Sequence, residues 1–83
     1  FNFLGNYPLA FENYEWARNL ATTWGNQARE AISLGLMAFA RFHQGESDVD
    51  DFSNQAYKVA KASNDNESLA QVLGQLAYIA GQK

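Results

Sequence analysis

The sequence contains no cysteine and only one proline among its 83 residues. Without cysteine, disulfide bridges and thiolate metal sites are excluded, and the redox compartment stays open with a preference for the cytoplasm. No apolar run approaches the ~18 residues of a membrane span, and the N-terminal segment lacks the basic start of a signal peptide. We therefore expect a cytoplasmic chain with no membrane partner.

Positive charge is also scarce, because six Lys and Arg residues stand against nine Asp and Glu residues and give a net charge of −3. The six cations are dispersed, whereas binding to nucleic-acid phosphates needs clustered cations. We expect no nucleic-acid partner. A chain of 83 residues suffices for one small hydrophobic core, so residues 1–83 are predicted to form a single domain.

The sequence does contain an internal repeat. The pair Leu34-Gly35 returns 39 residues later as Leu73-Gly74. Further pairs at this offset include Ala31 and Ala70, Ala38 and Ala77, Ala17 and Ala56, Ala21 and Ala60, and Phe39 and Tyr78. The matches follow the spacing of one helix face, which predicts a stacked repeat with two helices in each period.

Four helices are predicted, near residues 8–23, 27–43, 49–63 and 67–80, each antiparallel to its neighbours along the chain. Pro8 suits the first turn of a helix, where a backbone N–H is not needed. Gly25 and Asn26 end the first helix and cap the second. Ser47 and Asp50 resemble a capping box for the third, and Asp65 or Asn66 caps the fourth.

The apolar spacing also predicts which side chains are buried. The helix at 27–43 is apolar nearly all round and should be covered on more than one side. For the other helices the residues expected to face inward are Leu9, Ala10, Tyr14, Trp16, Ala17, Leu20, Ala21 and Trp24; Val49, Phe52, Ala56, Val59, Ala60 and Ser63; and Leu69, Ala70, Leu73, Leu76, Ala77 and Ala80. Gly35 and Gly74 lower helix stability by ~1 kcal/mol each, so we expect each to pack closely against a repeat partner.

These features resemble the tetratricopeptide repeat family. The segment Leu4-Gly5-Asn6-Tyr7-Pro8-Leu9-Ala10 is similar to the turn between the two helices of that repeat, and Leu34-Gly35 and Leu73-Gly74 are similar to its first helix. The 39-residue period corresponds to a variant longer than the usual 34 residues. The resemblance implies an all-α, right-handed solenoid fragment: the second helix of one repeat (8–23), a full repeat (27–63) and the first helix of the next (67–80).

The resemblance also implies a function, because the first helices of such repeats line a concave groove that receives peptides. The side chains expected in this groove are Arg29, Ile32, Leu36, Phe39, Ser68, Gln71, Gln75 and Tyr78. One helix would be apolar and the next lined with amides, which suits a peptide with an apolar anchor. Alternatively, Ile32, Leu36 and Phe39 belong to the core of a longer array. The Lys and Asn residues with which one subset of the family binds acidic chaperone tails are absent from these positions.

Other site chemistries are less consistent with the sequence. His43 has no nucleophile or acidic partner at helical spacing, so it is interpreted as a surface histidine near a helix C-terminus. The acidic run from Glu46 to Asp51 lacks the glycine and the closing acid of a calcium loop and is interpreted as a helix cap. We expect no enzymatic activity, no catalytic residue, no metal and no cofactor.

The expected function is therefore a non-enzymatic scaffold that binds a protein or peptide partner. A rival hypothesis is self-assembly, in which the open ends of the solenoid stack on other copies and form, for example, a homodimer. Phe1, Phe3, Tyr7 and the apolar second helix would supply apolar surface for it.

Overall fold

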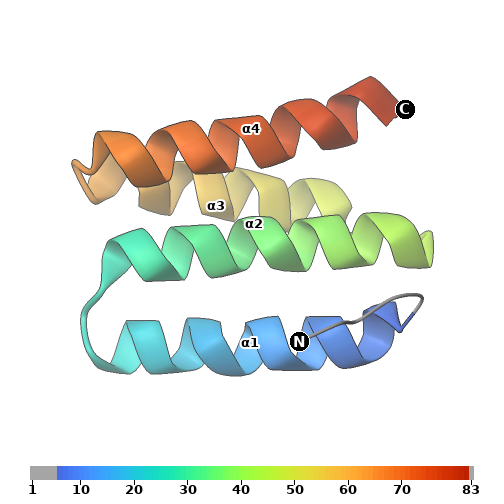
Figure 1. Ribbon diagram of the computed structural model, residues 1–83, viewed down its shortest axis with the longest axis horizontal. Coiled ribbons are helices and arrows are strands. Elements are labelled where there is room, and N and C mark those ends of the chain that lie inside the picture. Colours follow the sequence, from blue (N-terminus) through green and yellow to red (C-terminus); the bar gives the residue numbers. More distant parts are fainter. Residues whose placement is uncertain (1–5, 83) are drawn as a thin grey trace.

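The computed structural model describes residues 6–82 and contains four helices (Figure 1). They are α1 (Tyr7–Thr23), α2 (Gln27–Gln44), α3 (Val49–Ala62) and α4 (Asn66–Gln82). No strand occurs within these residues. The all-α prediction is confirmed, and every predicted helix boundary lies within two residues of the observed one. Phe1, Phe3, Leu4 and Gly5, which entered the sequence predictions, lie outside the described residues.

The turn between α1 and α2 has the predicted chemistry. Gly25 has a φ of +70°, a left-handed conformation that glycine adopts without steric cost. The side chain of Asn26 then accepts a hydrogen bond of 3.1 Å from the backbone N–H of Arg29 and so caps α2. At the start of α1, Asn6 caps the helix in the same way and Pro8 lies in its first turn.

The predicted capping box at the start of α3 is not formed. Asp48, not Ser47, is the N-cap residue, and no side chain makes the capping hydrogen bond. Instead, the Asp48 carboxylate accepts a hydrogen bond of 3.0 Å from the guanidinium of Arg41, which also lies 4.6 Å from the centre of the Phe11 ring. The ion pair ties the end of α2 to the start of α3. At the start of α4, the Asp65 carboxylate accepts hydrogen bonds from the backbone N–H groups of Glu67 and Ser68. Asp65 was one of the two predicted caps.

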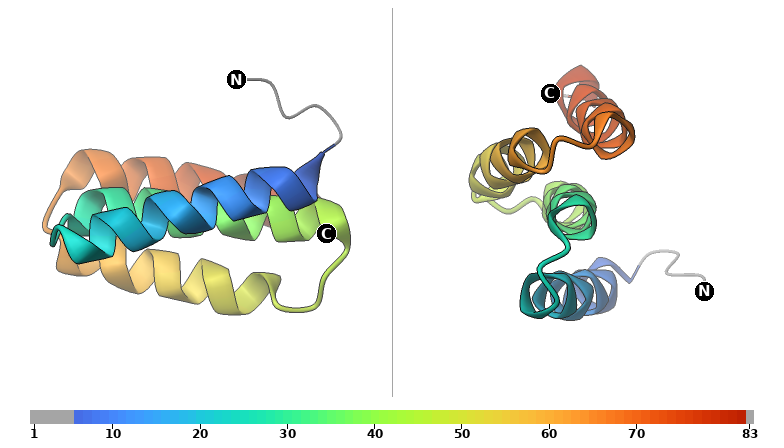
Figure 2. Two further views of the ribbon diagram at one scale, coloured as in Figure 1. Left: turned by 90° about the horizontal axis from the view of Figure 1, so that it is seen from below. Right: turned by 90° about the vertical axis from the view of Figure 1, so that its left-hand side faces the viewer.

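The helices form a zigzag row that is best seen end-on (Figure 2). Successive helices run in opposite directions, so α2 and α4 lie side by side and point the same way (Figure 1). Helix α2 contacts the other three helices, and α3 also contacts α4. The backbones of α1 and α4 make no contact with each other, and these two helices form opposite ends of the row.

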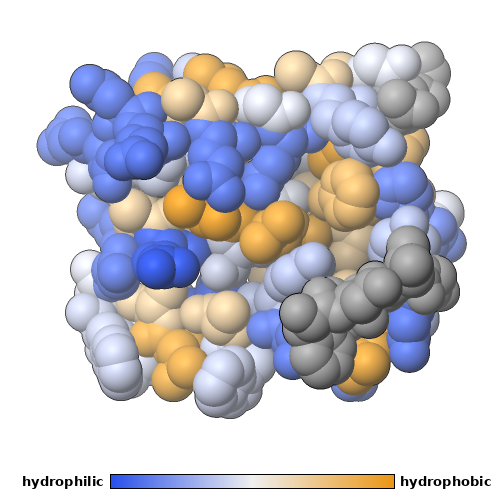
Figure 3. Space-filling model, viewed as in Figure 1, coloured by the Kyte–Doolittle hydropathy of each residue, from blue (hydrophilic) through white to orange (hydrophobic). Residues whose placement is uncertain are grey.

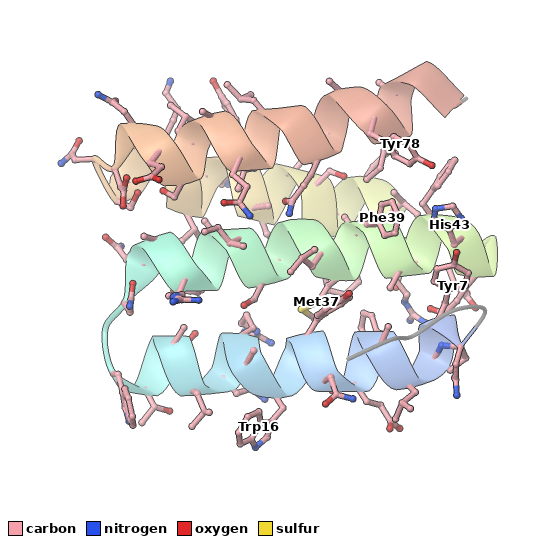
Figure 4. All side chains as sticks on the ribbon, viewed as in Figure 1. Tyr7, Trp16, Met37, Phe39, His43 and Tyr78 are labelled. Carbon is pink, nitrogen blue, oxygen red and sulfur yellow. The ribbon has the colours of Figure 1, made fainter. Side chains whose placement is uncertain are left out.

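The core lies around α2, as its all-round apolar sequence predicted. Ala31, Leu34 and Met37 of α2 pack with Ala56 and Ala60 of α3 and Val72 of α4. A smaller cluster joins Ala38, Val49 and Ile79. Met37 points from α2 toward α1 (Figure 4). Three of the six buried residues of the larger cluster are alanine, whose small side chain lets helix backbones approach closely.

Several inward predictions for α4 are wrong. Leu69 and Leu76 pack against the core, but Ala70, Leu73, Ala77 and Ala80 are exposed. Leu73 has 45% of its surface exposed, whereas its repeat counterpart Leu34 has 2%. A Cβ added at Gly74 would meet no atom within 4 Å, so the close packing expected there is absent within the described residues. The reason is tertiary: α3 and α4 both cover α2, and no described helix covers this side of α4.

The outer side of α1 departs from prediction in the same way. Ala10 and Ala21 are buried and Tyr14 packs against the core, but Trp16 is 66% and Trp24 81% exposed. Leu9 and Leu20 are also exposed. Trp16 points away from α2 (Figure 4). The backbone of α1 lies beside that of α2 alone, and α1 reaches α3 through the Phe11 ring, which meets the Phe52 ring edge-on. Only one side of α1 therefore reaches the core.

Candidate peptide-binding groove

The candidate site lies on the face where α2 and α4 run side by side. Ile32, Leu36 and Phe39 are spaced along one side of α2, and each is half-buried. Apolar side chains gather along the middle of this face, where α2 runs, and polar side chains border them toward α4 (Figure 3). The three residues are therefore neither fully exposed nor part of the buried core of this chain.

One end of the groove is a polar hollow at the N-terminal ends of α2 and α4. It encloses about 460 Å³ and brings together four of the eight predicted groove residues, namely Arg29, Ile32, Ser68 and Gln71. The other lining residues are Asn26, Ala28, Asp65 and Glu67. The lining includes the guanidinium of Arg29 and the carboxylates of Asp65 and Glu67, so the hollow carries charge of both signs.

The other end is a cluster of aromatic rings (Figure 4). Phe39 and Tyr78, predicted as groove neighbours, have ring centres 5.4 Å apart. His43 lies 4.5 Å from Phe39 and stacks on Tyr7 at 4.6 Å. Tyr78 is 45% exposed and His43 is exposed, so the cluster presents flat ring surface to solvent.

His43 and Tyr7 are not among the eight predicted groove residues, although the 39-residue offset did place His43 beside Gln82. His43 does lie near the C-terminal end of α2, as expected of a surface histidine. The spacing of 32, 36, 39 and 43 follows one helix face and places His43 next to Phe39. Tyr7 comes from α1, and no local pattern relates it to α2.

Midway along the candidate site, Gln75 packs into the contact between α2 and α4. Its side-chain amide lies over Gly35, where the amide carbon would be 2.9 Å from an added Cβ. Its carbonyl oxygen is buried without a hydrogen-bond partner within the described residues. Gly35 therefore faces α4, which corrects the expectation that it touches its repeat partner α3. For a ligand, Gln75 offers the amide N–H groups rather than the oxygen.

Ser68 belongs to the α3–α4 turn more than to an open ligand surface. It is buried, and its hydroxyl donates a hydrogen bond of 3.0 Å to the backbone carbonyl of Asp65. The same hydroxyl is 3.3 Å from that of Ser63. Because these contacts already occupy the hydroxyl, it is not free to bind a ligand. Ser68 contributes to the polar hollow as a buried lining residue.

A second hollow, of about 260 Å³, lies between α1 and α2 and was not predicted. Its wall is formed by Trp16, Ala17, Leu20, Ala21, Trp24, Asn26, Arg29 and Ser33. The α1 residues of this wall were predicted to face inward. The hollow shares Asn26 and Arg29 with the polar end of the groove.

Within residues 6–82, no group of three or more His, Asp or Glu side chains is placed to hold a metal ion. The same part of the chain contains no helix long and apolar enough to cross a membrane.

Calorimetric titration with calcium is expected to show no binding tighter than about 100 µM. Counted from Glu46, the sixth and twelfth loop positions are Asp51 and Tyr57 instead of glycine and glutamate. Asp48 is engaged by Arg41, and α3 begins at Val49, so the run cannot wrap around an ion as a loop. Tighter binding that a chelator reverses would contradict the prediction.

Comparison with known proteins identifies no relative: no family model, no curated protein and no solved structure matches the chain. The resemblance to the tetratricopeptide repeat therefore rests on the residue pattern alone.

Proposed function

We propose that the chain is a non-enzymatic binding module of tetratricopeptide-like, right-handed solenoid type, which holds an extended segment of a protein partner in the groove between α2 and α4. The observation that carries the proposal is the half-exposed row of Ile32, Leu36 and Phe39 beside the side chains of α4. A half-exposed apolar row gains free energy when a ligand covers it, at about 25 cal/mol per Å².

The dimensions of the groove support a short extended ligand. From Arg29 to His43, α2 rises by about 21 Å at 1.5 Å per residue. An extended peptide covers this length with about six residues. Gln71 and the N–H groups of Gln75 are available to bond the peptide main chain, which gives affinity without demanding a particular sequence.

The two ends of the groove favour different ligand groups. The ring cluster of Phe39, His43 and Tyr78 suits an aromatic or other large apolar anchor, because rings pack at offset or edge-to-face angles. The polar hollow holds Arg29 with Asp65 and Glu67, so a strongly acidic peptide would meet two carboxylates. The preferred partner segment is therefore apolar at one end and polar, without strong negative charge, at the other.

Selection from a random seven-residue peptide library displayed on phage tests the proposal. Peptides with a large apolar or aromatic anchor are expected to be enriched, with a Kd of about 10–100 µM for synthetic copies. Leu36→Gln removes apolar surface from the middle of the groove and should weaken these peptides by about tenfold or more, while circular dichroism shows an unchanged helix content.

The matched control is Leu73→Glu. Leu73 lies two residues from both Gln71 and Gln75, which places it about 180° around α4 from the groove. This variant should bind the selected peptides as wild type does. The proposal is wrong if no peptide is enriched, or if the enriched peptides bind Leu36→Gln as tightly as wild type.

A further inference from the structure

The contact between α2 and α3 has two halves. The counterpart of the α2 half recurs uncovered on α4, and part of the counterpart of the α3 half recurs uncovered on α1. On α2, Ala31, Leu34 and Ala38 are buried in the clusters that include α3. Their counterparts 39 residues later are Ala70, Leu73 and Ala77, which are exposed. With Gly74, Ala80 and Gly81 they form the outer face of α4, all six residues exposed.

The α3 half of the contact has its counterpart on α1. Phe52, Val59 and Ser63 of α3 are half-buried. Ala17 and Ala21, the counterparts of the buried Ala56 and Ala60, are already half-buried and buried within the chain. The residues 39 positions before Phe52, Val59 and Ser63, in contrast, are Asn13, Leu20 and Trp24, and all three are exposed. Together with Leu9 and Trp16 they form the α1 stripe, which spans only about 80° of the helix circumference at 100° per residue.

The α1 stripe and the outer face of α4 cannot pack against each other within one chain. Helices α1 and α4 lie at opposite ends of the row and make no backbone contact (Figure 2). A second copy, in contrast, can bring its α1 to the α4 of the first. The row of helices would then continue from one chain into the next.

We propose that the chain associates head to tail, with the α1 stripe of one copy packed on the outer face of α4 of another, as α3 packs on α2. The interface is heterologous, because it joins two different surfaces, and it leaves one free face at each end of the assembly. Such an interface that does not close produces open linear oligomers. This proposal uses surfaces outside the groove and is independent of the proposed function.

The two faces match in shape, and both are uncharged. The side chains on the outer face of α4 are short, since five of its six residues are Ala or Gly. The face is also open, because a Cβ at Gly74 would meet no atom within 4 Å. The α1 stripe carries large side chains, with Trp16 66% and Trp24 81% exposed. Neither face contains a charged residue, so association buries no unpaired charge.

The size of the interface sets the expected affinity. A helix of 17 residues is about 25 Å long, and one such helix face is at the lower limit of stable interfaces. We therefore expect a Kd of roughly 10–100 µM for each step of association.

Sedimentation velocity of the full chain from about 5 to about 500 µM tests the proposal. The weight-average mass of wild type should rise by at least about 1.5-fold above the 9.3 kDa of one chain as concentration increases. Leu73→Glu blocks the face on α4, and Trp16→Glu blocks the stripe on α1. Both sites are exposed, so each variant should keep its helix content and remain monomeric.

Mixing the two variants decides whether the interface is heterologous. Each retains the face that the other has lost, so an equimolar mixture should form a pair of about twice the single-chain mass and grow no further. Leu36→Gln, in the groove, should associate as wild type does. A wild type that stays monomeric at the highest concentration, blocked variants that still associate, or a mixture that stays monomeric would each overturn the proposal.

Discussion

Leu34→Ala is expected to lower the free energy of unfolding by about 2–5 kcal/mol. Leu34 is 2% exposed and packs in the cluster that joins α2, α3 and α4, so truncation leaves a cavity that three helices would have to move to fill. At ~0.05–0.15 kcal/mol per residue, a chain of this length has a total stability of about 4–12 kcal/mol, of which this loss is a large part. Urea unfolding followed by circular dichroism measures the change.

Leu73→Ala is the matched control, because Leu73 occupies the same place in the repeat and is also followed by glycine. Leu73 is 45% exposed, so its truncation should cost less than about 1 kcal/mol. Both measurements should be made at a concentration where the chain is monomeric. Equal losses at the two sites would mean that the α4 side is covered and would contradict the observed exposure of Leu73.

This pair of leucines shows where sequence reasoning reached its limit. The spacing of apolar residues and the turn residues at Gly25, Asn26 and Asp65 predicted four helices with accurate ends, because these signals act within a few residues. The burial of Leu34 and exposure of Leu73 depend on which helices lie alongside. A local pattern that repeats gives the same prediction twice, whereas the packing around it differs.

The candidate groove was partly predictable for a related reason. The 39-residue offset placed Phe39 beside Tyr78, and the two rings do contact each other. The offset could not reveal that Tyr7 of α1 stacks on His43, because that contact joins helices with no repeat relation. It also could not give the orientation of Gln75, whose amide turns inward only because Gly35 leaves room for it.

The start of α3 shows a local rule overridden by a contact between elements. Ser47 and Asp50 have the spacing of a capping box, yet the helix begins one residue after Asp48 and lacks a side-chain cap. Arg41 engages Asp48 from the end of α2 while lying over the Phe11 ring of α1. A half-buried ion pair between α2 and the start of α3 thus replaces the local capping hydrogen bond. The sequence spacing alone could not show that Arg41 lies close enough to Asp48 to form it.

Gly35→Leu is expected to lower the free energy of unfolding by about 1–3 kcal/mol, because the new side chain overpacks the contact between α2 and α4. The atoms nearest to a Cβ at Gly35 all belong to the side chain of Gln75. The double variant with Gln75→Ala should therefore recover part of the loss, and thermal and urea unfolding of the four members of this cycle would measure the coupling.

Gly74→Leu is the matched control: its Cβ meets open space, and replacing a helical glycine should stabilise α4 by roughly 0.5–1 kcal/mol. If Gly35→Leu were as harmless as Gly74→Leu, α2 and α4 would not approach closely at this point, and the groove between them would lose its floor.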